Sequence, residues 1–167
     1  IPLLDELLDS WPEVRLNIDC KALPAIEPLV ETIRRHRAEQ RVCVASFSER
    51  RLRRLRRLLG PGVATSYAAP GVAALRLVPT TAAIRLLAGS GSQVAQVPIG
   101  ARHLRVVTPA FVSRLHAVGR QVHVWTLDAP ELIEQVLDAG ADGVMTDRPD
   151  VLREVLRSRG QWAGDAA

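Results

Sequence analysis

The chain contains 167 residues, which is long enough for one domain with a substantial hydrophobic core. Hydrophobic residues make up 47% and charged residues 24% of it, as in ordinary soluble globular proteins. No apolar run approaches the roughly 20 residues that cross a bilayer, and the first residues lack the order of a signal peptide. These features predict a soluble cytoplasmic protein without a transmembrane segment, and they leave room for a targeting segment on a longer parent protein.

In chain order, short apolar strands alternate with helical patterns, which is typical of repeated βα units and a parallel sheet. An opening helix is expected at residues 2–10. Strands are expected at residues 15–20, 41–46, 63–66, 93–97, 121–126 and 143–146. Helices are expected near residues 24–39, 49–59, 71–87, 109–118, 129–139 and 149–157. The sequence therefore predicts an α/β fold with six βα units.

Two aspartates stand at expected helix starts. Asp128 precedes the helix at 129–139, with Glu131 in the position of a capping-box partner and Gly140 at the helix end. Asp147 precedes the last helix, where an aspartate commonly accepts backbone N–H bonds. We expect both aspartates to cap these helices, and for Asp147 we favour this over metal ligation.

The end of the first strand carries side chains that can perform chemistry. In the segment NIDCK, residues 17–21, alternation puts Asn17, Asp19 and Lys21 on one polar face. A carboxylate and an ammonium about 7 Å apart along a strand can hold a divalent cation and a phosphate oxygen on it. They can equally form a structural ion pair. Lys21 is the only lysine among 22 basic residues, which suggests a specific requirement for a compact ammonium, although chance can also place one lysine here.

Further motifs stand at the ends of the later strands. They are SF at 46–47, QVP at 96–98, HVWT at 123–126 and GADGVMTDRP at 140–149. Together with NIDCK, and in this order, they resemble the later strands of the glycerophosphodiester phosphodiesterases, which are metal-dependent barrel enzymes. The resemblance covers nearly the whole chain.

The resemblance implies roles for three residues. Asp19 matches the family's acidic metal ligand, although many relatives carry glutamate there, and Lys21 matches its phosphate-binding lysine. The implied cofactor is a divalent cation, Mg²⁺ or Ca²⁺, for which a carboxylate is a suitable hard ligand. Trp125 is expected to pack against the alcohol or glycerol part of the substrate, or else to close the barrel mouth. The implied reaction hydrolyses a small-molecule glycerophosphodiester to an alcohol and glycerol phosphate, a step of glycerophospholipid metabolism.

Other motifs of that family cannot be found in the chain. They are a histidine-arginine-glycine motif with a nearby PEN sequence, a Glu-x-Asp metal pair and a His-Asp motif. A complete barrel takes about 250 residues. We therefore expect a TIM-type (β/α)8 barrel at residues 1–160 that is incomplete and lacks the first two βα units, followed by a tail at 161–167. Without the family's catalytic histidines, the chain alone is expected to be inactive.

None of the four histidines is expected to replace the missing ones. His123 lies on the same strand face as Trp125 but deeper, where an interior histidine is the better interpretation. His36, His103 and His116 lie in helical or loop patterns. Cys20 and Cys43 are expected to be buried and reduced, because their spacing suits neither a disulfide nor zinc.

Three hypotheses about partners remain. A non-catalytic module that binds phosphate through Lys21 and surface arginines is the alternative to an enzyme. Nucleic acid is not expected, because leucines interleave with the arginines of residues 50–57 at helical spacing, which favours a solvated face above a core-facing stripe. Self-association is expected, because the missing units would leave the edges of the strands at 15–20 and 143–146 exposed.

Overall fold

The computed structural model describes residues 2–78, 80–87, 91–101 and 104–164. His103 and the last residues of the expected tail, 165–167, lie outside these ranges. The chain divides into two compact units. One comprises Ile1–Val78 with Arg85–Val94, and the other comprises Pro79–Ile84 with Ala95–Ala167.

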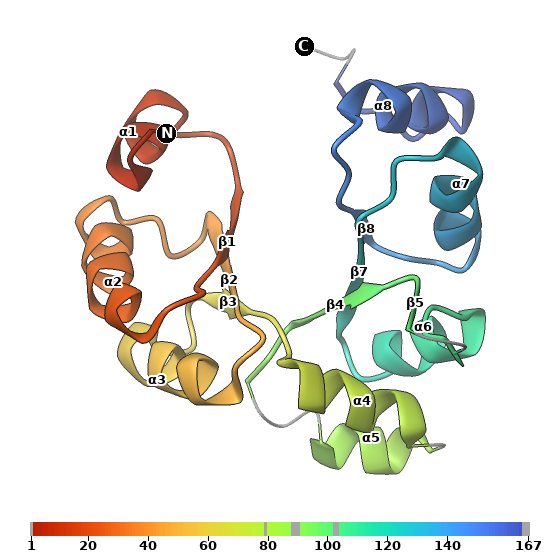
Figure 1. Ribbon diagram of the computed structural model, residues 1–167, viewed down its shortest axis with the longest axis horizontal. Coiled ribbons are helices and arrows are strands. Elements are labelled where there is room, and N and C mark those ends of the chain that lie inside the picture. Colours follow the sequence, from red (N-terminus) through yellow and green to blue (C-terminus); the bar gives the residue numbers. More distant parts are fainter. Residues whose placement is uncertain (1, 79, 88–90, 102–103, 165–167) are drawn as a thin grey trace. The chain divides into compact units, whose positions relative to one another are not determined.

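The first unit is built on a sheet with the strand order β1-β2-β3, in which neighbouring strands are parallel (Figure 1). The strands are β1 (Leu16–Asp19), β2 (Val42–Ala45) and β3 (Ala64–Thr65). The helices are α1 (Leu4–Ser10), the short 3-10 helix η1 (Leu23–Ala25), α2 (Ile26–Arg35), α3 (Glu49–Leu59) and α4 (Ala69–Leu77). An isolated parallel bridge pairs Ser66, just after β3, with Val94, and both residues belong to this unit.

The apolar core of this unit lies between the sheet and its helices. Ile26 and Ile33 of α2 and Leu55 of α3 are fully buried in one cluster with Val44 of β2. Leu16 and Ile18 of β1 are partly buried against the same cluster. Because side chains alternate along a strand, the intervening residues of β1 face away from this core.

Helix α1 is fixed to the unit by one buried leucine and by polar contacts. Leu8 is 3% exposed and belongs to the core cluster. The His36 ring contacts two carboxylates of α1, with Nε2 2.8 Å from Asp5 Oδ1 and Nδ1 3.0 Å from Asp9 Oδ1. Arg41 donates to the carbonyl oxygens of Leu8 and Trp11 at the end of the helix. The expected opening helix is therefore confirmed and packed.

The second unit has the strand order β4-β7-β8. These strands are β4 (Val94–Pro98), β7 (Gln121–Trp125) and β8 (Gly143–Val144), and β7 and β8 are parallel. Its helices are α6 (Pro109–His116), α7 (Pro130–Asp138) and α8 (Pro149–Ser158), whereas α5 (Thr81–Leu87) is divided between the two units at Ile84 and Arg85. Val122 and Val124 of β7 are fully buried, as are Phe111 of α6 and Ile133 of α7.

The six expected strands are confirmed, each with bounds within two residues of those predicted. The expected helix at 71–87 is wrong, because the chain forms α4 and α5 instead. Val78 follows α4 with an extended backbone (ψ 121°), as expected for a residue that precedes a proline. A short antiparallel hairpin of β5 (Gly100–Ala101) and β6 (Leu104–Arg105) was not predicted. Residues 161–164 of the expected tail lie outside helices and strands.

Candidate active site

Asp19 and Lys21 lie at the carboxyl end of β1. Asp19 is on the face of the strand opposite Leu16 and Ile18, which pack on the core. The Lys21 Nζ lies 3.9 Å from Asp19 Oδ2, and the two side chains are 82% and 31% exposed. Both side chains therefore project from the strand end on the side away from the apolar core. An ion pair this exposed contributes little to stability, about 0–1 kcal/mol.

Ser46 connects the ends of β1 and β2. Its buried hydroxyl donates to the Cys20 carbonyl oxygen at 2.7 Å and accepts from Arg51 Nε at 2.8 Å. Phe47, the next residue, is 61% exposed. Sequence reasoning placed Arg51 on the solvated face of its helix and so missed this contact. The signal that could have indicated this contact was the position of Arg51 in the first turn of the helix that follows Ser46.

His123 and Gly143 face each other on neighbouring strands of the second unit. A Cβ atom at position 143 would lie 2.8 Å from His123 Cδ2, so the ring occupies the space that a side chain would need. Burial lowers the pKa of His123, an effect that the charge of Asp142 partly opposes. These observations support the interior histidine that the sequence predicts. Trp125, on the same face of β7, is partly buried at the strand end.

Asp128 makes contacts that differ from the predicted cap. Its Oδ1 accepts from Thr146 Oγ1 and from the Asp147 backbone N, both at 2.9 Å. Helix α7 instead has Ala129 at its N-cap, without a side-chain bond. The prediction for Asp128 is therefore wrong, because donors of the segment after β8 form hydrogen bonds with its carboxylate oxygen.

Asp147 is also not a helix cap. Helix α8 has Arg148 at its N-cap, again without a side-chain capping bond. The Arg148 backbone N donates to Thr146 Oγ1 at 2.9 Å, while Asp147 offers its backbone N to Asp128. The turn thus joins the ends of β7 and β8 through Asp128 and Thr146. Gly140 does end helix α7 as predicted, with a φ of 90°.

The described residues do not form a complete site for a divalent cation. Within them, no group of three or more His, Cys, Asp or Glu side chains is arranged to hold a metal ion. Magnesium and calcium need about six or more oxygen ligands, several of which can be water. Asp19 has the right chemistry for one ligand and cannot form such a site alone.

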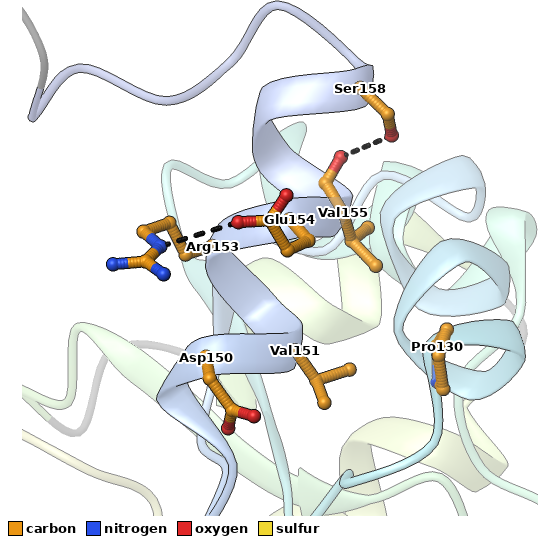
Figure 2. Close-up of a pocket in the computed structure, with 7 residues that line it drawn as sticks. All are labelled: Pro130, Asp150, Val151, Arg153, Glu154, Val155 and Ser158. Carbon is orange, nitrogen blue, oxygen red and sulfur yellow. Dashed lines mark hydrogen bonds and ion pairs between the residues drawn. The ribbon is translucent and has the colours of Figure 1, made fainter.

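A pocket of about 340 Å³ lies elsewhere, between helices α7 and α8 (Figure 2). Its lining is Pro130, Asp150, Val151, Arg153, Glu154, Val155 and Ser158. Two of the lining residues, Arg153 and Glu154, form an ion pair at 3.5 Å. None of Asp19, Lys21 or Trp125 lines it, so this pocket is separate from the predicted site.

The two cysteines are free, as predicted from their spacing. Cys20 is buried, whereas Cys43 is only partly buried. Burial raises the pKa of both thiols, that of Cys43 to about 11. Since the thiolate is the reactive form, neither cysteine is activated as a nucleophile. In the described part of the chain, no helix combines the length and apolar composition needed to cross a lipid bilayer.

Comparison with known proteins gives a consistent result. Residues 1–151 match the model of the Glycerophosphoryl diester phosphodiesterase family. The chain is 45% identical over 166 residues to a Mycobacterium tuberculosis protein named "Probable glycerophosphodiester phosphodiesterase 2". That match covers 98% of this chain and 63% of the mycobacterial protein. The chain thus spans less than two thirds of this relative.

Solved structures share the fold. A glycerophosphodiester phosphodiesterase from Parabacteroides distasonis superposes with a TM-score of 0.75 at 23% identity, covering 96% of this chain and 66% of that one. A phosphodiesterase from Oleispira antarctica, in complex with the product sn-glycerol-3-phosphate, gives a TM-score of 0.71 at 20% identity. The latter match covers 94% of this chain and 62% of that one. These likenesses indicate a TIM-type fold.

Proposed function

Because this chain belongs to the glycerophosphoryl diester phosphodiesterase family, whose members are phosphoric diester hydrolases, we propose that it supplies the phosphate-holding part of a metal-dependent glycerophosphodiester phosphodiesterase. The reaction releases an alcohol and glycerol phosphate. The observation that carries this proposal is the common projection of Asp19 and Lys21 from the end of β1. The product bound in the Oleispira phosphodiesterase supports a ligand of this class.

Lys21 binds a non-bridging oxygen of the phosphate in this proposal. Its side chain is 82% exposed and is 3.9 Å from its carboxylate neighbour, so little must be broken for the ammonium to reach a ligand. A positive charge at this position stabilises the negative charge that develops on the phosphate in the transition state.

Asp19 contributes one oxygen ligand to Mg²⁺ or Ca²⁺ in this proposal. When bound, such a cation neutralises charge on the phosphate and stabilises the transition state by several kcal/mol. The 3.9 Å contact supports this assignment, because a cation held by Asp19 would lie within reach of the same phosphate as Lys21.

Trp125 packs against the alcohol or glycerol part of the substrate in this proposal. Trp125 ends β7 and is partly buried as a residue, so part of its surface remains accessible to a ligand. Its role is tested by Trp125→Ala in a catalytically complete chimera of this chain with the mycobacterial relative, where the change should raise KM more than it lowers kcat if the ring only binds the non-reacting part of the substrate.

In this proposal the barrel part comprises residues 1–160. The chain alone is expected to turn over no substrate, because it lacks the family's histidine motifs. The direct experiment measures glycerol phosphate released from glycerophosphocholine with Mg²⁺, with Ca²⁺ and with chelator. We expect no turnover by the chain alone. A chimera in which this chain replaces the matching part of the mycobacterial relative should be active and metal-dependent.

Two variants of that chimera test the assigned residues. Lys21→Gln and Asp19→Asn should each lower kcat/KM by about 10²- to 10³-fold, as is typical when one charge-stabilising group is lost. Gln40→Ala, at an exposed position of the same unit, is the control. Metal-dependent turnover by the chain alone, or full activity of both variants, would contradict the proposal.

β1 and β8 each lie at one end of a three-stranded sheet and have one paired edge among the described strands. Unpaired edges promote pairing between chains. We expect the isolated chain to self-associate through them, and a stable monomer at micromolar concentration in light scattering would contradict this.

A second candidate function is a phosphate-binding module without catalysis. The observation that favours it is again the exposed ammonium of Lys21, which needs no cation to attract an anion. The two functions differ in the chimera, since a binding module would retain sn-glycerol 3-phosphate affinity and give no turnover in that context.

A further inference from the structure

Arg51 lies in the first turn of α3, next to the strand ends that carry Asp19 and Lys21. Its Nε donates to Ser46 Oγ, and that hydroxyl donates to the Cys20 carbonyl oxygen. The Cys20 carbonyl belongs to the peptide bond that joins Cys20 to Lys21. Ser46 therefore holds the Arg51 guanidinium one hydroxyl group away from the backbone of Lys21.

The charges of Arg51 and Asp19 both act on the thiol of Cys20. Burial raises the pKa of the Cys20 thiol, whereas the charge of Arg51 lowers it and the charge of Asp19 raises it. Arg51 and Asp19 are thus both within electrostatic reach of the same sulfur atom. Because its Nε bonds to Ser46 Oγ, which in turn bonds to the Cys20 carbonyl oxygen, the guanidinium lies at the same strand end as the Asp19 and Lys21 pair.

Arg51 has capacity for a ligand. A guanidinium carries five N–H donors in a planar fork, and the Nε–H is the one that bonds to Ser46. Among the residues that the structure describes, no carboxylate forms an ion pair with Arg51. The remaining fork suits bidentate binding of a phosphate or carboxylate.

We propose that Arg51 forms a second anion-binding position beside Lys21, and that the site takes glycerophosphodiesters whose alcohol carries a second phosphate. This inference rests on the proposed function, because it assigns the diester phosphate to Lys21. Arg51 then binds the phosphate on the alcohol.

Two ligands that differ only in the second phosphate provide the test: glycerophosphoinositol and glycerophosphoinositol 4-phosphate. Calorimetric titration of the 167-residue chain at about 0.15 M salt limits the effect of distant charges, because the screening length is then about 8 Å. We expect the phosphorylated ligand to bind about tenfold more tightly, as one charge-assisted contact typically gives.

Three variants separate the roles. Arg51→Gln should abolish the preference and leave the affinity for glycerophosphoinositol unchanged. Arg57→Gln makes the same charge change at an exposed position in the last turn of α3 and should retain the preference. Lys21→Gln should weaken the binding of both ligands. If Arg51→Gln fails to fold in a thermal melt, Arg51→Met, which keeps the apolar stem, replaces it.

The failures are distinguishable. If the preference for the phosphorylated ligand survives in the Arg51 variant, or if both ligands lose affinity equally, Arg51 only positions Ser46. Either result would overturn this inference and leave the proposed function standing. Binding of both ligands that is unaffected by Lys21→Gln, or no binding at all, would overturn the proposed function together with it.

Discussion

The imidazole of His123 occupies the space above Gly143 on the neighbouring strand, where a Cβ atom would lie 2.8 Å from its Cδ2. The two residues pair in the register of β7 and β8. The neighbouring ring therefore requires a glycine at position 143. The backbone conformation does not require one, because the φ of Gly143 is not positive. His123 precedes Trp125 by two residues on β7, so this contact lies near the end of that strand.

Gly143→Ala should destabilise the chain by about 1–3 kcal/mol, because an added methyl group forces the ring or the strand to move. Urea unfolding measures the difference. In a double-mutant cycle with His123→Ala, which removes the ring, most of this cost should disappear. An equal cost of Gly143→Ala in both backgrounds would show that the ring is not the obstacle.

The stability of the chain should fall as the pH drops below about 6.5. Burial lowers the pKa of His123 from its ordinary value of 6.5, so the unfolded chain binds a proton at a pH where the folded chain does not. The stabilisation from the neutral ring is complete above the unfolded pKa and is lost as the pH falls through the folded pKa. Unfolding free energies from pH 8 to pH 5 should therefore decline less in His123→Gln. Identical slopes in the two proteins would contradict the prediction.

Asp128→Ala should loosen the turn at Thr146 to Arg148 and leave helix α7 intact, because the carboxylate bonds to the turn and not to the helix. The expected loss of stability is about 1 kcal/mol, since the contact is exposed. Hydrogen exchange reads out the Asp147 amide directly. Asp128→Asn, which keeps one acceptor oxygen, is the control. Faster exchange of the amides at the start of α7 in Asp128→Ala would contradict this prediction and support the capping interpretation.

The carboxyl of Asp150 should titrate at about pH 2. A hydrogen bond from Arg148 holds the pKa of Asp150 below its ordinary value of 3.8, at about 2, with Arg148 Nη2 2.7 Å from Asp150 Oδ2. Any stability from this pair is present above pH 3.8 and is lost as the pH falls toward 2. Carboxyl NMR titration should give a pKa near 3.8 in Arg148→Gln. An unchanged pKa in that variant would contradict the assigned cause.

Strand positions and the polar face of β1 could be predicted from the sequence, because alternation of apolar and polar residues is a local property. Asp19 and Lys21 share a strand end for this reason. The capping prediction for Asp128 failed because its competing partner, Asp147, is 19 residues further along the chain. Local spacing does not report which donors a folded turn brings to one oxygen.

The arginine-rich helix α3 shows the same limit. Its leucines face the core as the spacing predicts, with Leu52 and Leu55 fully buried. Two of its arginines are not simply solvated, however. Arg51 bonds to Ser46, and Arg56, with a side chain only 14% exposed, donates to Thr65 Oγ1 and the Ser66 carbonyl oxygen. Periodicity identifies the buried stripe of a helix and cannot tell which long side chains turn back to the sheet.

The most direct measurement of the central claim uses Lys21, the only lysine in the sequence. Protein made with ¹³C-labelled lysine gives one lysine side-chain signal, which can be followed during titration with sn-glycerol 3-phosphate in the presence of Mg²⁺. We predict a saturable shift of the Lys21 Cε–Hε signal, weakened in Asp19→Asn. Ligand binding that shifts other signals and leaves that of Lys21 unchanged would contradict the assignment of the phosphate to this residue.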